Sequence, residues 1–165
     1  MMLGIALVLS SCKKDNDNTP AWQKIWILDV ANMAGKVEMI GVLDMQEDGK
    51  LGYGELLTKS LIDEFKENLD EDPQEIKDII LQFKENDILI VYGSYVISET
   101  DETSGTITMS IPIDGKLEVA AGTYRDLTES SMTVIIGGEE LKFKTPQALG
   151  IKVGKAHDGT KFMGN

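Results

Sequence analysis

Apolar and polar residues alternate over most of this chain, and one stretch follows a period near four instead. Alternation predicts a half-buried β-strand because successive strand side chains point to opposite faces. A strand pattern covers 22–28, a β-branched segment containing a glycine covers 37–45, and an Asp-Gly turn lies at 47–50. We therefore predict a strand followed by a hairpin that runs back to about residue 53.

The stretch after this hairpin has helical spacing. Four large apolar residues recur every four positions: Leu57, Leu61, Phe65 and Leu69. With charged residues between them, they predict an amphipathic helix over 55–69. Asp-Pro-Gln-Glu at 72–75 is typical of a helix start and predicts a second short helix, so the helical insert covers 55–78. Residues 79–84 fit either a helix or a strand, and we favour the strand.

The rest of the chain reads as strands separated by polar or glycine-containing turns. They are 88–98, 106–111, 117–125, 132–136 and 140–144. Eight or so short antiparallel strands hide their edges best by closing into an up-and-down barrel, and the alternative is an open β-sandwich. The Gly-rich residues 146–165 are predicted to form a loosely held tail with at most one edge strand.

Composition narrows the function classes. The chain has 165 residues, 42% of them hydrophobic, and a formal net charge of -12. This fits one folded domain, and the negative field disfavours nucleic-acid binding. Cys12 is the only cysteine, which excludes an intramolecular disulfide framework and a cysteine-ligated zinc cluster.

The N-terminus has the features of a targeting segment. Residues 1–11 carry no charge, and the apolar run at 3–9 is much shorter than the roughly 20 residues of a membrane-spanning helix. Leu9-Ser10-Ser11-Cys12 resembles the lipobox of bacterial lipoproteins. The resemblance implies cleavage after residue 11 and acylation of Cys12 with fatty acids such as palmitate. A signal normally begins with Lys or Arg, so we expect the true start to lie upstream.

Residues 12–20 are polar, end in proline and predict a flexible tether. Lys13 and the mixed Lys-Asp cluster after it resemble lipoproteins that Gram-negative bacteria sort to the outer membrane and display on the cell surface. The resemblance implies a protein attached to the membrane by its lipid, with its folded part in water.

Residues 21–145 resemble the lipocalin-like domains of surface lipoproteins. The resemblance rests on the N-terminal Trp strand, the Asp-Gly turn and two Gly-x-Tyr hairpins. It implies a non-catalytic barrel that binds a small or hydrophobic ligand, with Trp26, Tyr95 and Tyr124 as candidate lining residues. The alternative is a structural or accessory subunit of a surface complex, with a packed interior and a protein partner.

One local motif could hold a metal ion. Residues 44–55 match a calcium loop in several positions, with Asp44, Gln46, Asp48 and Glu55 as side-chain ligands and Lys50 as a carbonyl ligand. However, the segment before it has a strand pattern where such a motif needs a helix. We therefore favour a hairpin turn and keep calcium binding as the alternative.

Candidate catalytic groups are few. His157 is the only histidine and lies in the polar tail, where we expect it to be solvated. The sequence contains no Gly-rich phosphate loop, nucleophile elbow or zinc-ligand spacing. We therefore predict a protein that is not an enzyme and uses no cofactor.

Overall fold

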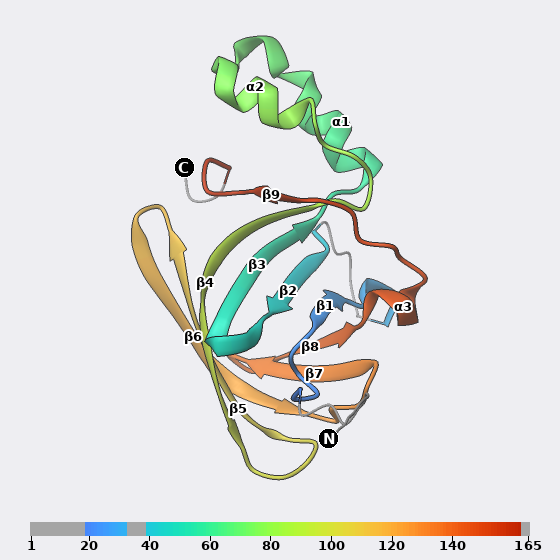
Figure 1. Ribbon diagram of the computed structural model, residues 1–165, viewed down its shortest axis with the longest axis vertical. Helices are drawn as coiled ribbons and strands as arrows, with labels where there is room; N and C mark the ends of the chain where they lie inside the picture. Colours follow the sequence, from blue (N-terminus) through green and yellow to red (C-terminus); the bar gives the residue numbers. More distant parts are fainter. Residues whose placement is uncertain (1–18, 33–38, 163–165) are drawn as a thin grey trace, which may run out of the picture.

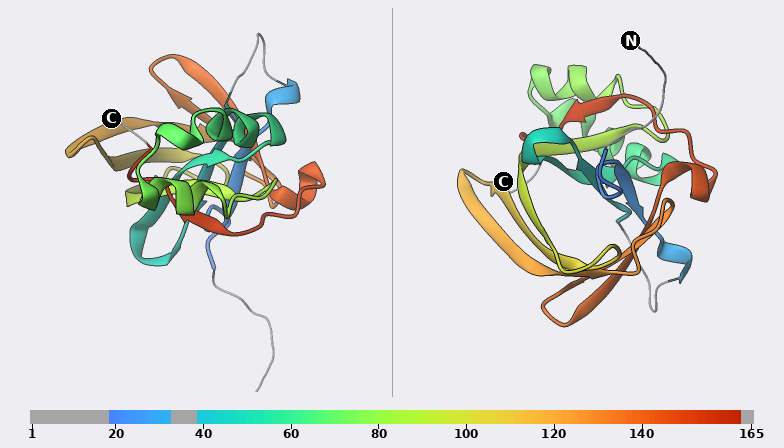
Figure 2. Two further views of the ribbon diagram at one scale, coloured as in Figure 1. Left: turned by 90° about the horizontal axis from the view of Figure 1, so that it is seen from above. Right: turned by 60° about the horizontal axis from the view of Figure 1, so that its bottom comes forward.

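The computed structural model describes residues 19–32 and 39–162, and Cys12 with the signal segment lies outside them. Eight strands form one closed antiparallel barrel, in which each strand pairs with the next and β8 pairs back with β1 (Figures 1 and 2). They are β1 (Ile25–Leu28), β2 (Gly41–Met45), β3 (Lys50–Leu56), β4 (Ile88–Glu99), β5 (Gly105–Ile113), β6 (Lys116–Arg125), β7 (Ser131–Ile136) and β8 (Glu139–Lys144). The predicted up-and-down barrel is confirmed, and the open sandwich is wrong because the first and last strands are hydrogen-bonded.

The seam between β1 and β8 closes the barrel. Ile27 lies opposite Lys144, and the Asp29 backbone N–H donates to the Lys142 carbonyl at 2.8 Å. Beyond the strand, the Lys144 Nζ atom lies 3.1 Å from the buried Asp29 carboxylate. A short 3-10 turn, η1 (Val30–Asn32), follows. An ion pair therefore reinforces a seam that is only two residue pairs long.

All eight barrel strands contribute to one apolar cluster in the interior, here called the inner core. Its members are Trp26, Leu43, Met45, Leu51, Val91, Tyr95, Ile107, Met109, Ile111, Tyr124, Leu127, Met132, Val134 and Phe143. Period-two alternation explains the set, since every second residue of a strand faces inward. Burial of so many large side chains is the main stabilising contribution to the barrel.

Two helices, here called the helical cap, lie beyond the ends of β3 and β4 (Figure 1). They are α1 (Lys59–Glu67) and α2 (Gln74–Ile80), joined by the 3-10 turn η3 (Leu69–Glu71). Thr58 caps α1, because its Oγ1 atom accepts a hydrogen bond from the Leu61 N–H at 3.1 Å. Two helices were predicted here and two are present.

Two boundaries of the predicted helical insert are wrong. The first helix begins at Lys59 and not at residue 55, because Glu55 and Leu56 still pair with β4. Residues 79–84 do not form a strand: α2 continues to Ile80, and a turn follows it. Ile80 and Phe83 are buried in the cap against Leu57 and Leu89. This packing favours a helix and a turn over a strand in residues 79–84.

The C-terminal segment is held against the barrel. It contains the short helix α3 (Pro146–Leu149) and the strand β9 (Ala156–Asp158), which pairs in parallel with β4 at residues 88–90. The partner strand β5 pairs only with residues 94–99 of β4, so β9 occupies the sheet edge that β5 leaves open. The one edge strand is present, but a loosely held tail is wrong.

Candidate functional site

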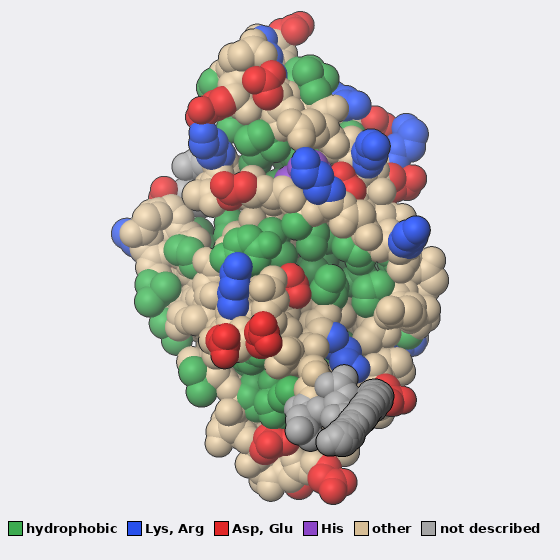
Figure 3. All heavy atoms as spheres, viewed as in Figure 1, with side chains coloured by type: hydrophobic (Ala, Val, Ile, Leu, Met, Phe, Trp, Pro, Cys, Tyr) green, Lys and Arg blue, Asp and Glu red, His purple; other side chains and the backbone are tan. Residues whose placement is uncertain are grey.

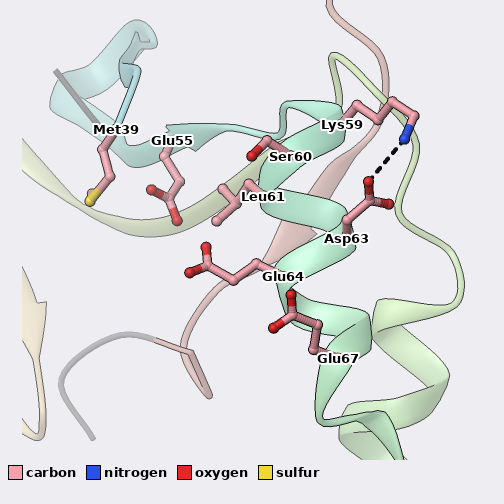
Figure 4. A pocket seen from close by; sticks show the side chains of 8 residues that line it. All are labelled: Met39, Glu55, Lys59, Ser60, Leu61, Asp63, Glu64 and Glu67. Carbon is pink, nitrogen blue, oxygen red and sulfur yellow. Dashed lines mark hydrogen bonds and ion pairs between the residues drawn. The ribbon is translucent and has the colours of Figure 1, made fainter. Parts of the chain in front are cut away.

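An open pocket of about 1020 Å³ lies between the end of β3 and one face of α1 (Figure 4). Its lining comes from β3, from α1 and from Met39, which lies two residues before β2. The lining residues are Met39, Glu55, Lys59, Ser60, Leu61, Asp63, Glu64 and Glu67. Four of these side chains are acidic and one is basic. The volume is at the upper end of the range of small-molecule sites.

Glu55 is the buried polar group of this pocket. Leu51 belongs to the inner core, so alternation along β3 directs Tyr53, Glu55 and Leu57 to the same inner face of the sheet. Leu57 is covered by the cap, whereas Glu55 faces the pocket. The Glu55 side chain is only 8% exposed, and its Oε2 atom has no hydrogen-bond partner among the described residues.

The environment of Glu55 disfavours its charged form. Burial raises the pKa of its carboxyl above the ordinary value of 4.5, and the nearby negative charge of Glu64 raises it further. In Figure 4 the carboxylates of Glu55 and Glu64 point toward one another across the pocket. The site can therefore hold a proton or an added positive charge between the two groups.

The helix α1 supplies the rest of the charge. Ser60, Glu64 and Glu67 are spaced by four and three residues, which aligns them on one face of the helix. Asp63 points away from Glu55 in Figure 4, and its Oδ2 atom pairs with Lys59 Nζ at 2.9 Å. Among the described lining residues, Lys59 is the only basic one, and it is engaged outside the acidic face. The described part of the chain offers Glu55, Glu64 and Glu67 no ion pair.

The three residues predicted to line a ligand cavity lie together, in the inner core. Trp26, Tyr95 and Tyr124 are 0%, 8% and 1% exposed. The Trp26 indole N–H donates to the Trp22 carbonyl at 2.8 Å, and the Tyr95 hydroxyl donates to the Gln46 carbonyl at 2.6 Å. A ligand at this end of the barrel would have to displace packed side chains.

Residues 44–55, the alternative calcium loop, lie in the β-hairpin that the sequence favoured. Asp44 lies in β2 opposite Gly52, while Glu55 lies opposite Gly41, so the two carboxylates are three positions apart and on opposite faces of the sheet. The Gln46 side-chain amide donates to Asp44 at 2.7 Å. At the turn η2 (Glu47–Gly49), Asp48 has a φ of 60°. Within 19–32 and 39–162 there is no group of three His, Cys, Asp or Glu residues that could hold a metal ion.

The prediction that His157 is solvated is wrong. It is 5% exposed, and Figure 3 shows only a small part of the histidine, in purple, beneath the helical cap. Its Nε2 atom lies 2.7 Å from Asp87 Oδ2, and its ring packs edge-on against Phe83. The parallel pairing of β9 with β4 carries His157 into the cap, which no local pattern indicates.

Asp87 anchors the C-terminal segment. Besides His157, its carboxylate accepts hydrogen bonds from the backbone N–H groups of Lys155 and Lys84, at 2.9 and 3.0 Å. Burial alone would raise the pKa of Asp87, but these hydrogen bonds outweigh it and lower the pKa below the ordinary value of 3.8. The His157–Asp87 pair is therefore a structural clamp between β9 and the loop before β4.

A second pocket, of about 790 Å³, lies beside α3 and is lined in part by Lys24 and Thr145. The Lys24 Nζ atom donates to the Glu129 carbonyl at 3.0 Å, and the Thr145 Oγ1 atom caps α3. These two polar groups already have partners within the protein. The pocket at β3 and α1 is therefore the stronger candidate site.

No family model, curated protein or solved structure matches this chain. In the two described ranges, no helix is both long and apolar enough to cross a bilayer. The strand order and the pairing of β8 with β1 define the barrel.

Proposed function

We propose that this protein is a lipid-anchored outer-membrane lipoprotein, displayed at the cell surface, whose lipocalin-like barrel is a non-catalytic binding module for a small ligand. The ligand would occupy the pocket between β3 and α1. One observation carries the binding function: Glu55 is buried, faces an open pocket and has no hydrogen-bond partner for its Oε2 atom among the described residues. The lipid anchor is proposed from the Cys12 motif alone.

A buried carboxylate without a partner lowers the stability of a fold, because burial removes water from the charged form. A bound ligand that pairs with Glu55 would offset this loss. The other end of the barrel interior is filled by the inner core, where Trp26, Tyr95 and Tyr124 are buried. The pocket at α1 thus combines open space with a buried carboxylate oxygen that has no hydrogen-bond partner among the described residues.

The place where the chain enters the barrel fits attachment by an N-terminal lipid. Ile25 starts β1 opposite Asp44, near the η2 turn, whereas α1 follows β3 at the other end of the barrel (Figure 1). A lipid on Cys12 would hold the protein through residues 12–20 at the end remote from the pocket. Such an anchor would leave the pocket facing away from the membrane surface.

Mass spectrometry of the protein isolated from native membranes tests the anchor. The expected product is an acylated N-terminal peptide that begins at Cys12, and the Cys12→Ala variant should lack both the acylation and the cleavage. An unmodified Cys12 in a soluble fraction with the signal segment still attached would remove the lipoprotein assignment.

Native mass spectrometry of the protein extracted in mild detergent tests the binding function. A retained small molecule should be lost in Ser60→Trp, which places a bulky ring on the pocket face of α1, and kept in Ser98→Trp. Ser98 is exposed on β4 and does not line this pocket, so it serves as the matched control. Absence of any retained molecule, or its retention in Ser60→Trp, would count against the proposal.

A second candidate is an accessory subunit of a surface complex. Three apolar side chains are well exposed on the barrel exterior: Val96 on β4 at 68%, and Leu117 and Val119 on β6 at 65% and 61%. Exposed apolar patches often mark protein contacts. This candidate predicts that the detergent-extracted protein elutes in a larger assembly of fixed stoichiometry, which Leu117→Ser with Val119→Ser should dissociate. Elution of the unmodified protein as a monomer would remove it.

A further inference from the structure

The pocket presents negative charge from two sides. Glu55 reaches it from β3, and Glu64 and Glu67 reach it from successive turns of α1 (Figure 4). Side chains three residues apart on a helix lie roughly 5 to 6 Å from each other. The arrangement is therefore two carboxylates about one helical turn apart, with a third facing the first of them.

We propose that the pocket binds an aliphatic diamine or polyamine, with one ammonium group between Glu55 and Glu64 and a second beside Glu67. This inference rests on the proposed binding function and names the chemical class of its ligand. The two nitrogens of an extended four-carbon diamine lie roughly 6 Å apart, close to one helical turn and to the separation of the carboxylates along α1.

The apolar part of the lining fits the same class of ligand. Met39 and Leu61 lie beside the acidic residues and offer contact surface for methylene groups. A pocket of about 1020 Å³ accommodates a flexible amine of this size. The formal net charge of -12 also raises the local concentration of small cations around the protein.

Charge balance within the site supports an ammonium ligand over a neutral one. Burial and the charge of Glu64 both raise the pKa of Glu55, which means that these surroundings disfavour two ionised carboxylates side by side. An ammonium group placed between them forms charge-assisted hydrogen bonds with both and removes their repulsion. A neutral ligand leaves the repulsion in place.

Isothermal titration calorimetry of the full chain, purified from membranes in mild detergent, tests the inference. The probes are 1,4-diaminobutane and spermidine, with 1,4-butanediol as the uncharged ligand of similar length. We expect one amine per protein and no binding of the diol. Glu55→Gln and Glu64→Gln should each weaken amine binding about tenfold or more, because each removes one charge-assisted contact.

Glu102→Gln is the matched control, since it makes the same charge change at an exposed residue outside the pocket. Unchanged binding in this variant supports a defined site. Equal weakening in all three variants, or binding of many amines per protein, would overturn the inference, because the overall charge would then explain the signal. Absence of amine binding, or binding of calcium in place of amines with the same dependence on Glu55, would overturn it too.

The two experiments can reject the amine ligand and the proposed binding function independently of each other. If no amine binds but native mass spectrometry finds another molecule that Ser60→Trp displaces, the amine class is wrong and the binding function stands. If neither experiment detects a ligand in this pocket, both are wrong.

Discussion

The two ends of this barrel are built from the same strands but differ in whether they bury a charged group. At the η2 end, the inner core buries Trp26 and Tyr95, and each donates a hydrogen bond to a backbone carbonyl. At the α1 end, Glu55 is almost as buried, but its Oε2 atom has no hydrogen-bond partner among the described residues, and Glu64 faces it.

If the pocket binds a ligand as proposed, one end of the barrel provides stability and the other end provides the binding site. Large buried side chains with satisfied polar groups stabilise the fold. A buried carboxylate beside a second carboxylate reduces stability, and groups with such shifted pKa values are concentrated at functional sites. The following variants test whether the two ends differ in this way.

Trp26→Ala should have the largest effect. It removes a fully buried ring from the inner core, and we expect the free energy of unfolding to fall by about 3 to 5 kcal/mol. Urea denaturation followed by circular dichroism measures the change, with the exposed Tyr92→Ala as a control of small effect. A loss below about 1 kcal/mol would mean that this end tolerates a cavity, and the contrast between the two ends would disappear.

His157→Ala should destabilise by about 2 to 3 kcal/mol, because it removes a donor to the buried Asp87 carboxylate. Limited proteolysis within 150–162 should become faster, while Lys152→Ala, an exposed change in the same segment, should leave both measurements unchanged.

The lowered pKa of Asp87 adds a pH dependence to the stability of the protein. The stabilisation by the Asp87 carboxylate is fully present at pH values above its ordinary pKa of 3.8. It is lost as the pH falls through the lowered pKa of Asp87 in the folded protein.

Tyr95→Phe and Tyr124→Phe form a matched pair within the inner core. The Tyr95 hydroxyl donates to the Gln46 carbonyl at 2.6 Å, so its removal should cost about 1 kcal/mol. The Tyr124 hydroxyl is buried without a hydrogen-bond partner among the described residues, so its removal should be neutral or stabilising. Thermal denaturation of the two variants side by side measures the difference, and equal losses would contradict it.

Glu55→Gln should produce only a small change in stability at pH 7, and this change should be a gain. Because the pKa of Glu55 is raised in the folded state, folding becomes less favourable as the pH rises from the ordinary value of 4.5 through the raised pKa. Glutamine lacks this titration. The variant should therefore melt at a higher temperature than the unmodified protein at pH 7, and the gain should vanish below pH 4.5. A gain that is equal at both pH values would point to packing and not to charge.

Several parts of the fold could be predicted from local pattern alone. The strand patterns after residue 88 correspond to β4 to β8, because alternation depends only on one face being buried. The Asp-Gly turn at Asp48 and Gly49 forms the β2–β3 hairpin, since both residues adopt positive φ. Barrel closure was predicted because exposed strand edges are unfavourable, and the pairing of β8 with β1 removes those edges.

The site could be predicted only in fragments. Glu55 stood out in the sequence as the last ligand of a calcium loop, and Glu64 as a charge on the polar face of a helix. Their approach depends on how α1 turns back over the end of β3, and no local spacing encodes that turn.

By itself, the sequence determined the properties that short stretches of chain decide: the strands and turns, the presence of two helices, the negative charge and the Cys12 motif. Tertiary structure alone decided where β3 gives way to α1, that residues 79–84 join the cap, that β9 buries His157 on Asp87, and that Glu55 meets Glu64. The physical reason is that strand pairing and side-chain burial join residues far apart in the sequence, and these contacts outweigh local preference wherever that preference is weak.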